Sequence, residues 1–244
     1  YVYYDFGSNI GIQVRKLFEP AKFKGAPVLK VFDQYFGVSP PRNKKVCAIG
    51  AEPNPNHWPV LGKIQTAYNK LGWRTLFFAR AVGATNSGEI TFYTDNAMAH
   101  KEWGFSIIDI TGRNATVKVK TMNLPSLVRY IAHQYRPAKT VMKFDVEGTE
   151  FKLIPAMILT GTFCYLDVLF AEWHNKFLTK KEKSANFQKV PEVLNQLVHL
   201  VKESSPQPRD YNCSLPKITD LDDETFKNKE WDGGPTGLVK GQTL

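Results

Sequence analysis

The stretch that decides the fold opens the chain and reads Tyr1-Val2-Tyr3-Tyr4-Asp5-Phe6-Gly7-Ser8-Asn9-Ile10-Gly11. An apolar, aromatic run ends in an acid, a glycine-rich turn follows at once, and residues 12–18 have the apolar spacing of a helix. A strand, an acidic glycine-rich turn and a helix in this order are typical of a doubly wound α/β sheet that binds a nucleotide-like ligand. The missing Cβ atoms of Gly7 and Gly11 favour a close approach of the backbone to that ligand.

Short apolar runs and helical patterns alternate along the rest of the chain. This alternation predicts a mostly parallel sheet with helices on both faces. Residues 20–45 are expected to be irregular, and residues 88–94 are expected to pair with the strand just before them across a Thr-Asn-Ser-Gly turn. We expect strands at residues 2–4, 46–51, 75–82, 88–94, 116–121, 140–144 and 165–171, and helices at 10–18, 57–71, 124–134, from 148 to about 159, and 190–202.

Length and composition fit one domain of 244 residues with a hydrophobic content of 43%. We expect residues 1–204 to form one α/β domain, and residues 205–244 to add edge strands and a loosely ordered tail to it. The net charge of +9 indicates a basic surface. The lysine-rich stretch 176–183 contains an acid and lacks interleaved aromatic residues, so no nucleic-acid partner is predicted.

The compartment is only weakly indicated by the sequence. No apolar run is long enough to span a membrane, since the best candidate, residues 153–170, is broken by Pro155 and Asp167. The three cysteines lie far apart without a C-x-x-C pair, which argues against zinc, and Cys47 and Cys164 are expected to be buried thiols. We expect a trimmed, soluble domain that is cytoplasmic or, if a leader or anchor preceded it, in the lumen of the secretory pathway.

Polar clusters follow four of the predicted strands. They occupy residues 5–11, 52–56, 145–150 and 172–175. In open parallel sheets the ligand binds outside the carboxyl ends of the strands. We therefore expect these four clusters to meet at one edge of the sheet and to form the functional site there.

The composition of the first turn limits the classes of ligand that it can bind. A dinucleotide-binding turn needs three glycines, but here Asn9 takes the middle position and the third glycine is missing. An asparagine side chain offers a donor and an acceptor, which suits an ammonium and a carboxylate better than a pyrophosphate. Glu52 can accept both hydroxyls of a ribose. The sequence thus indicates S-adenosylmethionine, with an NAD-dependent oxidoreductase as an alternative.

The motifs together resemble a known family. Asp5-Phe-Gly7-Ser-Asn9-Ile-Gly11 is similar to the first motif of class I S-adenosylmethionine-dependent methyltransferases. With Glu52-Pro-Asn-Pro55, Ala81-Val82-Gly83, Lys143-Phe-Asp145-Val-Glu147-Gly148-Thr-Glu150 and Glu172-Trp-His174, the set resembles the FkbM-type methyltransferases. The resemblance implies a Rossmann-like methyltransferase sheet of seven strands. It also implies transfer of a methyl group to oxygen, in several members to the hydroxyl of a carbohydrate.

Position in these motifs implies a role for each cofactor-binding residue. The first turn would hold the methionine end, Glu52 the ribose hydroxyls, and Asp145 would lie near the sulfonium and ammonium groups. The cofactor-binding residues expected on this basis are Asp5, Gly7, Ser8, Asn9, Gly11, Glu52, Pro53, Asn54, Arg80, Ala81, Val82 and Asp145.

Methyl transfer is an in-line displacement, so the protein has to align the acceptor and exclude water. A sugar hydroxyl is a poor nucleophile and needs a general base. His174 is the first candidate because its ordinary pKa lies near neutrality, with Glu147 and Glu172 next and Asp145 close to the reacting groups. Glu147 and Glu150 can also be explained as acids that favour the start of a helix.

Two further alternatives and one open question accompany this interpretation. The set Asp145, Glu147, Glu172 and His174 is also chemically suited to Mg²⁺ or Mn²⁺, as in a metal-assisted O-methyltransferase of a small-molecule diol. A catalytically inactive methyltransferase-like binding module is another alternative. The small-molecule or glycan acceptor is not fixed; the aromatic patch Phe32, Tyr35 and Phe36 and the loop 96–105 with His100 and Trp103 are candidate acceptor walls or core residues.

Overall fold

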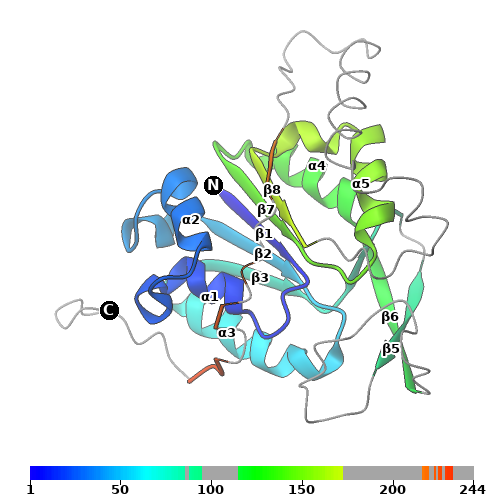
Figure 1. The fold of residues 1–244 in the computed structure, drawn as a ribbon, viewed down its shortest axis with the longest axis horizontal. Coiled ribbons are helices and arrows are strands. Elements are labelled where there is room, and N and C mark those ends of the chain that lie inside the picture. The colour runs from blue at the N-terminus through cyan, green and yellow to red at the C-terminus, as the bar shows by residue number, and fades with distance from the viewer. Residues whose placement is uncertain are drawn as a thin grey trace, which may run out of the picture.

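A six-stranded sheet forms the centre of the protein (Figure 1). The computed structural model describes residues 1–85, 88–94, 115–172, 216–219, 223, 225, 226 and 229–232. The strand order is β3-β2-β1-β7-β8-β9, and all five neighbouring pairs are parallel. The predicted mostly parallel α/β sheet is confirmed, but with six strands in the described part of the chain rather than seven. The strands are β1 (Val2–Phe6), β2 (Cys47–Ala51), β3 (Arg74–Phe78), β7 (Thr140–Phe144), β8 (Val168–Ala171) and β9 (Lys217–Thr219).

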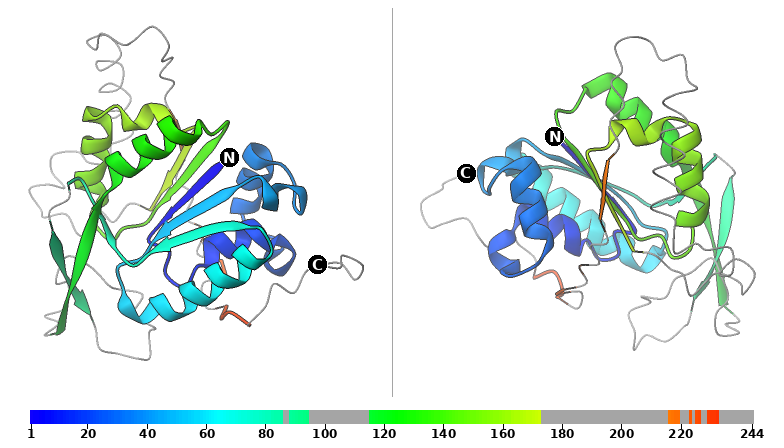
Figure 2. Two further views of the ribbon diagram at one scale, coloured as in Figure 1. Left: turned by 180° about the vertical axis from the view of Figure 1, so that it is seen from behind. Right: turned by 45° about the horizontal axis from the view of Figure 1, so that its top comes forward.

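Helices cover both faces of this sheet, as predicted (Figures 1 and 2). Alternation of side chains along β1 explains the two layers. Tyr4 and Phe6 belong to the core with α4 and α5, whereas Tyr3 belongs to the core with α1, α2 and α3. The helices are α1 (Ile12–Phe18), α2 (Val28–Phe36), α3 (Trp58–Lys70), α4 (Leu124–Tyr135) and α5 (Glu150–Leu159), with single 3₁₀ turns η1 (Pro20–Phe23), η2 (Pro41–Lys44), η3 (Pro55–His57) and η5 (Thr162–Tyr165).

The strand expected at residues 75–82 is divided between two sheets. The N–H of Arg80 donates to the carbonyl of Phe78 at 2.9 Å, and this tight turn ends β3. The chain then enters a small sheet with the order β4-β6-β5, built from β4 (Ala81–Gly83), β5 (Glu89–Thr94) and β6 (Ala115–Asn123). The pairing expected for residues 88–94 is therefore wrong, because β5 pairs with β6 in antiparallel register.

A helix, α2, lies within residues 20–45, which were expected to be irregular. Val28, Phe32 and Phe36 follow one another at intervals of four and are all buried, which gives the helix one apolar face. The ring of Phe36 lies 5.8 Å from that of Tyr1, at the amino end of β1. This aromatic patch is therefore core at the end of the sheet opposite the polar clusters, and it is not an acceptor wall.

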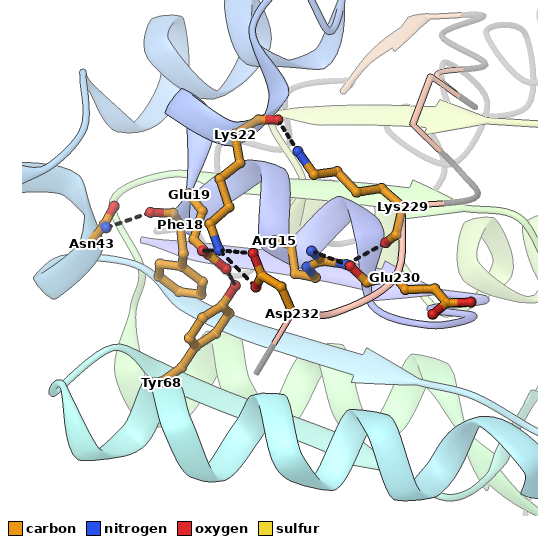
Figure 3. Close-up of polar contacts among 9 residues, drawn as sticks. All are labelled: Arg15, Phe18, Glu19, Lys22, Asn43, Tyr68, Lys229, Glu230 and Asp232. Carbon is orange, nitrogen blue, oxygen red and sulfur yellow. Dashed lines mark hydrogen bonds and ion pairs between the residues drawn. The ribbon is translucent and has the colours of Figure 1, made fainter. Parts of the chain in front are cut away.

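The described residues near the C-terminus pack against α1 (Figure 3). All seven residues of α1 are buried, including Arg15 and Lys16. Arg15 donates from Nη1 to the carbonyl of Lys229 at 2.7 Å, and Lys16 Nζ lies 3.0 Å from Asp223 Oδ1. The charged groups of Arg15 and Lys16 thus find acceptors in a segment more than 200 residues away in the sequence.

Two expectations about the compartment can be compared with the structure. Cys47 has a free thiol, as expected, but it is partly buried and not fully buried. Cys164 is disulfide-bonded, so the expected free thiol is wrong for Cys164. Among the described residues, no helix combines the length and the apolar character needed to cross a bilayer.

Candidate functional site

The ends of four parallel strands lie in one row. Phe6 pairs in register with both Ala51 and Phe144, and Phe144 pairs with Ala171. The residues that follow these four positions therefore leave the sheet at the same edge. The polar clusters that begin at residues 5, 52, 145 and 172 do meet there, as the sequence predicted, although residues 173–175 lie outside the described part of the chain.

The backbone N–H groups of the first turn are all engaged within the protein. The turn and the loop after β2 are linked through the carbonyl of Ala51 and the carboxylate of Glu52. A pyrophosphate bound at such a turn would need these N–H groups. The bonds are Gly7 N–H and Ser8 N–H to the Ala51 carbonyl (3.0 and 3.2 Å), Asn9 N–H to Glu52 Oε2 (2.6 Å), Ile10 N–H to Asn9 Oδ1 (2.8 Å) and Gly11 N–H to the Ser8 carbonyl (2.8 Å).

The two glycines of this turn are needed for contacts inside the protein. Gly7 has φ +80°, and a Cβ atom there would lie 1.7 Å from the carbonyl oxygen of Asp145. Gly11 has φ +79°, and its Cβ would press on Ile64 and Leu61 at 3.1 Å. The sequence predicted a close approach of backbone to ligand. The approach to a ligand stays a prediction; the structure shows a close approach of Gly7 to the loop after β7 and of Gly11 to α3.

Glu52 joins the two loops that flank the site. Its Oε1 accepts the N–H of Asn54 at 2.8 Å, while Oε2 accepts the N–H of Asn9. The side chain is nearly buried, and Trp58 donates to the Glu52 carbonyl at 2.9 Å. A carboxylate oxygen has two lone-pair directions. Each oxygen of Glu52 therefore retains capacity to accept a ligand hydroxyl.

Asp5 is the least satisfied group of the site. Its side chain is fully buried at the end of β1, and neither carboxylate oxygen has a hydrogen-bond partner in the described part of the chain. Burial raises the pKa of Asp5 to about 6; Lys143 opposes the shift, and the charges of Asp145 and Glu52 add to it. Buried polar groups almost always have partners, so an orphaned carboxylate needs an explanation. The Oγ of Ser8 donates to the backbone carbonyl of Asp5 at 2.6 Å, and its proximity to the Asp5 carboxylate opposes the rise of the pKa.

Lys143 brings a positive charge to the same place. Its Nζ donates to the carbonyl of Gly7 and to Oδ2 of Asp145, both at 2.9 Å, and lies 4.0 Å from Oδ1 of Asp5. Burial alone would lower the pKa of Lys143, but the carboxylates of Asp145 and Asp5 outweigh this effect and raise the pKa. Lys143 therefore stays protonated at neutral pH.

The loop after β7 has an unusual backbone. Glu147 has φ +49°, a left-handed conformation that is uncommon for a residue other than glycine and is often found at functional sites. The carboxylate of Glu150 turns back and accepts the N–H of Gly148 at 2.9 Å. Glu150 therefore acts as an acid of the first helical turn, while Glu147 and Asp145 remain partly buried at the edge of the sheet.

The residues expected at the adenine rim are mostly structural. Asn54 is buried, and its Oδ1 accepts the N–H of Asn56 at 3.0 Å to begin η3. Pro53 is partly buried beside it. Ala81 and Val82 are buried core residues of β4, whereas Arg80 is partly buried in the turn before them. The N–H groups of Arg80 and Glu52 both donate to the Phe78 carbonyl, which places this turn next to the loop after β2.

The expected site residues after β8 and in the loop 96–105 are described only in part. His174 and the loop 96–105, with His100 and Trp103, lie outside the described residues. Glu172 is described, partly buried, and follows β8 with its N–H donating to Phe144 at 2.9 Å. Within the described ranges, no group of three or more His, Cys, Asp or Glu residues is arranged to hold a metal ion.

Lys143 was not predicted as a site residue, although it opens the motif Lys143-Phe-Asp145-Val-Glu147-Gly148-Thr-Glu150. Its position two residues before Asp145 puts both side chains on one side of the strand, and this signal was present in the sequence. Its pairing with Asp5 depends on strand order and is not local.

Comparison of the chain with known protein families, with curated proteins and with solved structures found no match.

Proposed function

We propose that the chain is an S-adenosylmethionine-dependent O-methyltransferase of the FkbM type, acting on a hydroxyl of a carbohydrate or a glycosylated metabolite. The observation that carries the proposal is the Asp5 carboxylate, which is fully buried and has no hydrogen-bond partner among the residues that the structure describes. Leaving such a group unpaired is costly. It is expected where a ligand supplies the missing donor.

The charges and donors of the site favour a cationic ligand over a phosphate. Asp5 lies near the carboxylates of Asp145 and Glu52. The N–H groups of residues 7–11, which would bind a pyrophosphate, already have partners in the protein. S-adenosylmethionine carries an ammonium and a sulfonium, and so matches this site better than NAD does.

The residues present fit the cofactor. Asp5 and Asp145 would bind the ammonium side of its amino-acid tail, and Glu52, with its remaining lone pairs, the ribose hydroxyls. The turn that contains Arg80 lies next to Glu52 and would border the base. This assignment extends the family resemblance of the motifs to positions that share one edge of the sheet.

The bound cofactor supplies a methyl group on a positively charged sulfur. The chain has to align the acceptor hydroxyl, keep out water and take up the hydroxyl proton. His174 remains the first candidate for the base, and Glu172 and Glu147 are carboxylates at the same edge.

Variants separate these candidates. His174→Ala is expected to lower turnover while the affinity for S-adenosylhomocysteine stays unchanged, with Glu172→Gln and Glu147→Gln as parallel variants. Retained turnover in His174→Ala, with loss in Glu172→Gln, would transfer the role to Glu172. Unchanged activity after exhaustive EDTA treatment is expected and separates this mechanism from metal assistance.

Calorimetric titration tests the proposed cofactor. We expect micromolar binding of S-adenosylhomocysteine and no comparable binding of NAD. Absence of binding at millimolar S-adenosylhomocysteine would refute the proposal. Binding without methylation of any acceptor would instead favour the inactive binding module.

The acceptor can be identified by mass spectrometry of a glycan library after incubation with labelled S-adenosylmethionine. A mass increase on carbohydrate hydroxyls is the expected result. Labelling confined to small-molecule diols would favour the alternative acceptor class.

The disulfide at Cys164 favours the lumen of the secretory pathway over the cytoplasm, because disulfides persist in oxidising compartments. Thiol titration of the natively expressed protein tests this part of the proposal. Recovery of all cysteines as free thiols would contradict it.

A further inference from the structure

Lys143 and Asp5 stand side by side at the centre of the sheet. They are register partners on the neighbouring parallel strands β7 and β1, so their side chains project from the same face. The Asp5 side chain is fully buried, and that of Lys143 is 13% exposed. A carboxylate and an ammonium are therefore held together next to the first turn.

The two groups nevertheless do not satisfy each other. Lys143 Nζ lies 4.0 Å from Asp5 Oδ1, which is longer than a hydrogen bond. It donates instead to Gly7 and Asp145, both at 2.9 Å. A lysine ammonium has three donors, so one donor of Lys143 has no acceptor among the described residues.

A Lys143 donor without an acceptor and an Asp5 carboxylate without a hydrogen bond among the described residues thus lie next to each other, at ion-pair distance. Together they are complementary to an α-amino acid zwitterion, which carries an ammonium and a carboxylate on the same carbon. The carboxylate of Asp5 suits the ammonium, and the third donor of Lys143 suits the carboxylate.

We propose that Lys143 is a binding residue that recognises the carboxylate of the cofactor's amino-acid tail, while Asp5 recognises its ammonium. This inference rests on the proposed function, since it assigns one more contact within the same site. The alternative is that the Lys143 ammonium occupies the position of the ligand's ammonium and competes with it. The two roles predict opposite effects of removing Lys143 on the affinity for the cofactor.

Three ligands separate these roles by calorimetry. S-adenosylhomocysteine carries the complete tail, its decarboxylated analogue keeps only the ammonium, and 5′-methylthioadenosine lacks both groups. For Lys143→Met we expect an affinity for S-adenosylhomocysteine about tenfold to a hundredfold lower, as for a lost hydrogen bond between charged groups. The affinities for the other two ligands should stay within about threefold, because they lack the carboxylate.

Two further variants complete the design. Lys143→Arg keeps a positive donor and should recover much of the affinity for S-adenosylhomocysteine. Lys139→Met is the matched control, because Lys139 precedes the same strand at its other end and pairs with Asp167 at the surface. It should leave all three affinities unchanged.

Equal weakening of all three ligands by Lys143→Met, or tighter binding of S-adenosylhomocysteine, overturns the inference while leaving the cofactor assignment intact. If Lys143→Met does not fold, the wild-type protein decides. Equal affinity for S-adenosylhomocysteine and its decarboxylated analogue then overturns the inference. A wild-type protein that binds none of the three ligands overturns the proposed function as well.

Discussion

Asp5 and Asp223 are both buried carboxylates, but the protein treats them in opposite ways. Asp223 bonds with Lys16 and accepts the N–H of Val28 and the N–H and hydroxyl of Thr225. Burial raises its pKa, but these hydrogen bonds outweigh burial and lower the pKa overall. Asp5 has no hydrogen-bond partner within the described ranges, and burial raises its pKa.

This difference between Asp223 and Asp5 distinguishes a structural role from a proposed role in ligand binding. The chain itself supplies every contact that Asp223 needs, from a helix and a segment that are far apart in sequence. Asp5 lies at the carboxyl edge of the sheet, where ligands bind in this class of fold. Asp223 therefore stabilises the folded protein, whereas the raised pKa of Asp5 means that its charged form is unfavourable in the ligand-free protein. The proposed ligand would account for this difference.

Removal of Asp223 should have the largest effect on stability. Asp223→Ala leaves Lys16 buried without its carboxylate, so the free energy of unfolding should fall by about 3–5 kcal/mol. Urea unfolding at pH 7 measures this effect. The matched control is Asp232→Ala in the same segment, because Asp232 is half exposed and its ion pair with Lys22 should contribute less than about 1 kcal/mol. Equal effects of the two variants would contradict the structural role of Asp223.

Neutralisation of Asp5 should act in the opposite direction. A rise of its pKa from 3.8 to about 6 is equivalent to about 3 kcal/mol, so Asp5→Asn should stabilise the ligand-free protein by up to that amount at pH 7.5. The folded state holds its proton more tightly than the unfolded state. The favourable contribution of Asp5 is therefore complete below about pH 4 and is lost as the pH rises through about 6.

The stability difference between Asp5→Asn and the wild type should accordingly be full above about pH 6 and disappear near pH 4. Urea unfolding of both proteins across this range measures it. A destabilised Asp5→Asn variant at pH 7.5 would mean that Asp5 is a structural carboxylate like Asp223.

The affinity for the ligand should also depend on the titration of Asp5, with a smaller effect in free energy. A proton on Asp5 competes with the ammonium of S-adenosylhomocysteine, so the affinity should fall about tenfold between pH 7 and pH 5. The groups that surround Asp5 are Lys143, Asp145 and Glu52. The control ligand is 5′-methylthioadenosine, which lacks the charged tail and should bind with the same affinity at both pH values. A parallel decline for both ligands would assign the pH effect to another group.

The parts of the fold that depend on local pattern could be predicted from the sequence. Alternation of strands and helices gave the parallel sheet, and the position of each polar cluster after a strand gave the edge where the clusters meet. The interruption at Arg80 was missed, because the apolar pattern continues through a turn that a backbone hydrogen bond creates. The helix α2 was not predicted, because a proline directly precedes it and a glycine directly follows it in the sequence.

Contacts between distant segments could not be predicted in the same way. The partners of Asp223 lie on α1 and at the start of α2, and nothing in a polar C-terminal stretch indicates them. The pairing of Lys143 with Asp5 follows only from the strand order. The missing partner of Asp5, which carries the functional proposal, is likewise a property of the folded protein and not of the motif.

The most direct test is the affinity of wild-type protein and Asp5→Asn for S-adenosylhomocysteine at pH 7.5, measured by calorimetry together with the unfolding free energy of each. We predict micromolar binding by the wild type. Loss of a buried charge pair with the ligand should weaken binding by Asp5→Asn about a hundredfold, although this variant is the more stable protein. Wild-type affinity in Asp5→Asn, or no binding by the wild type, would contradict the account.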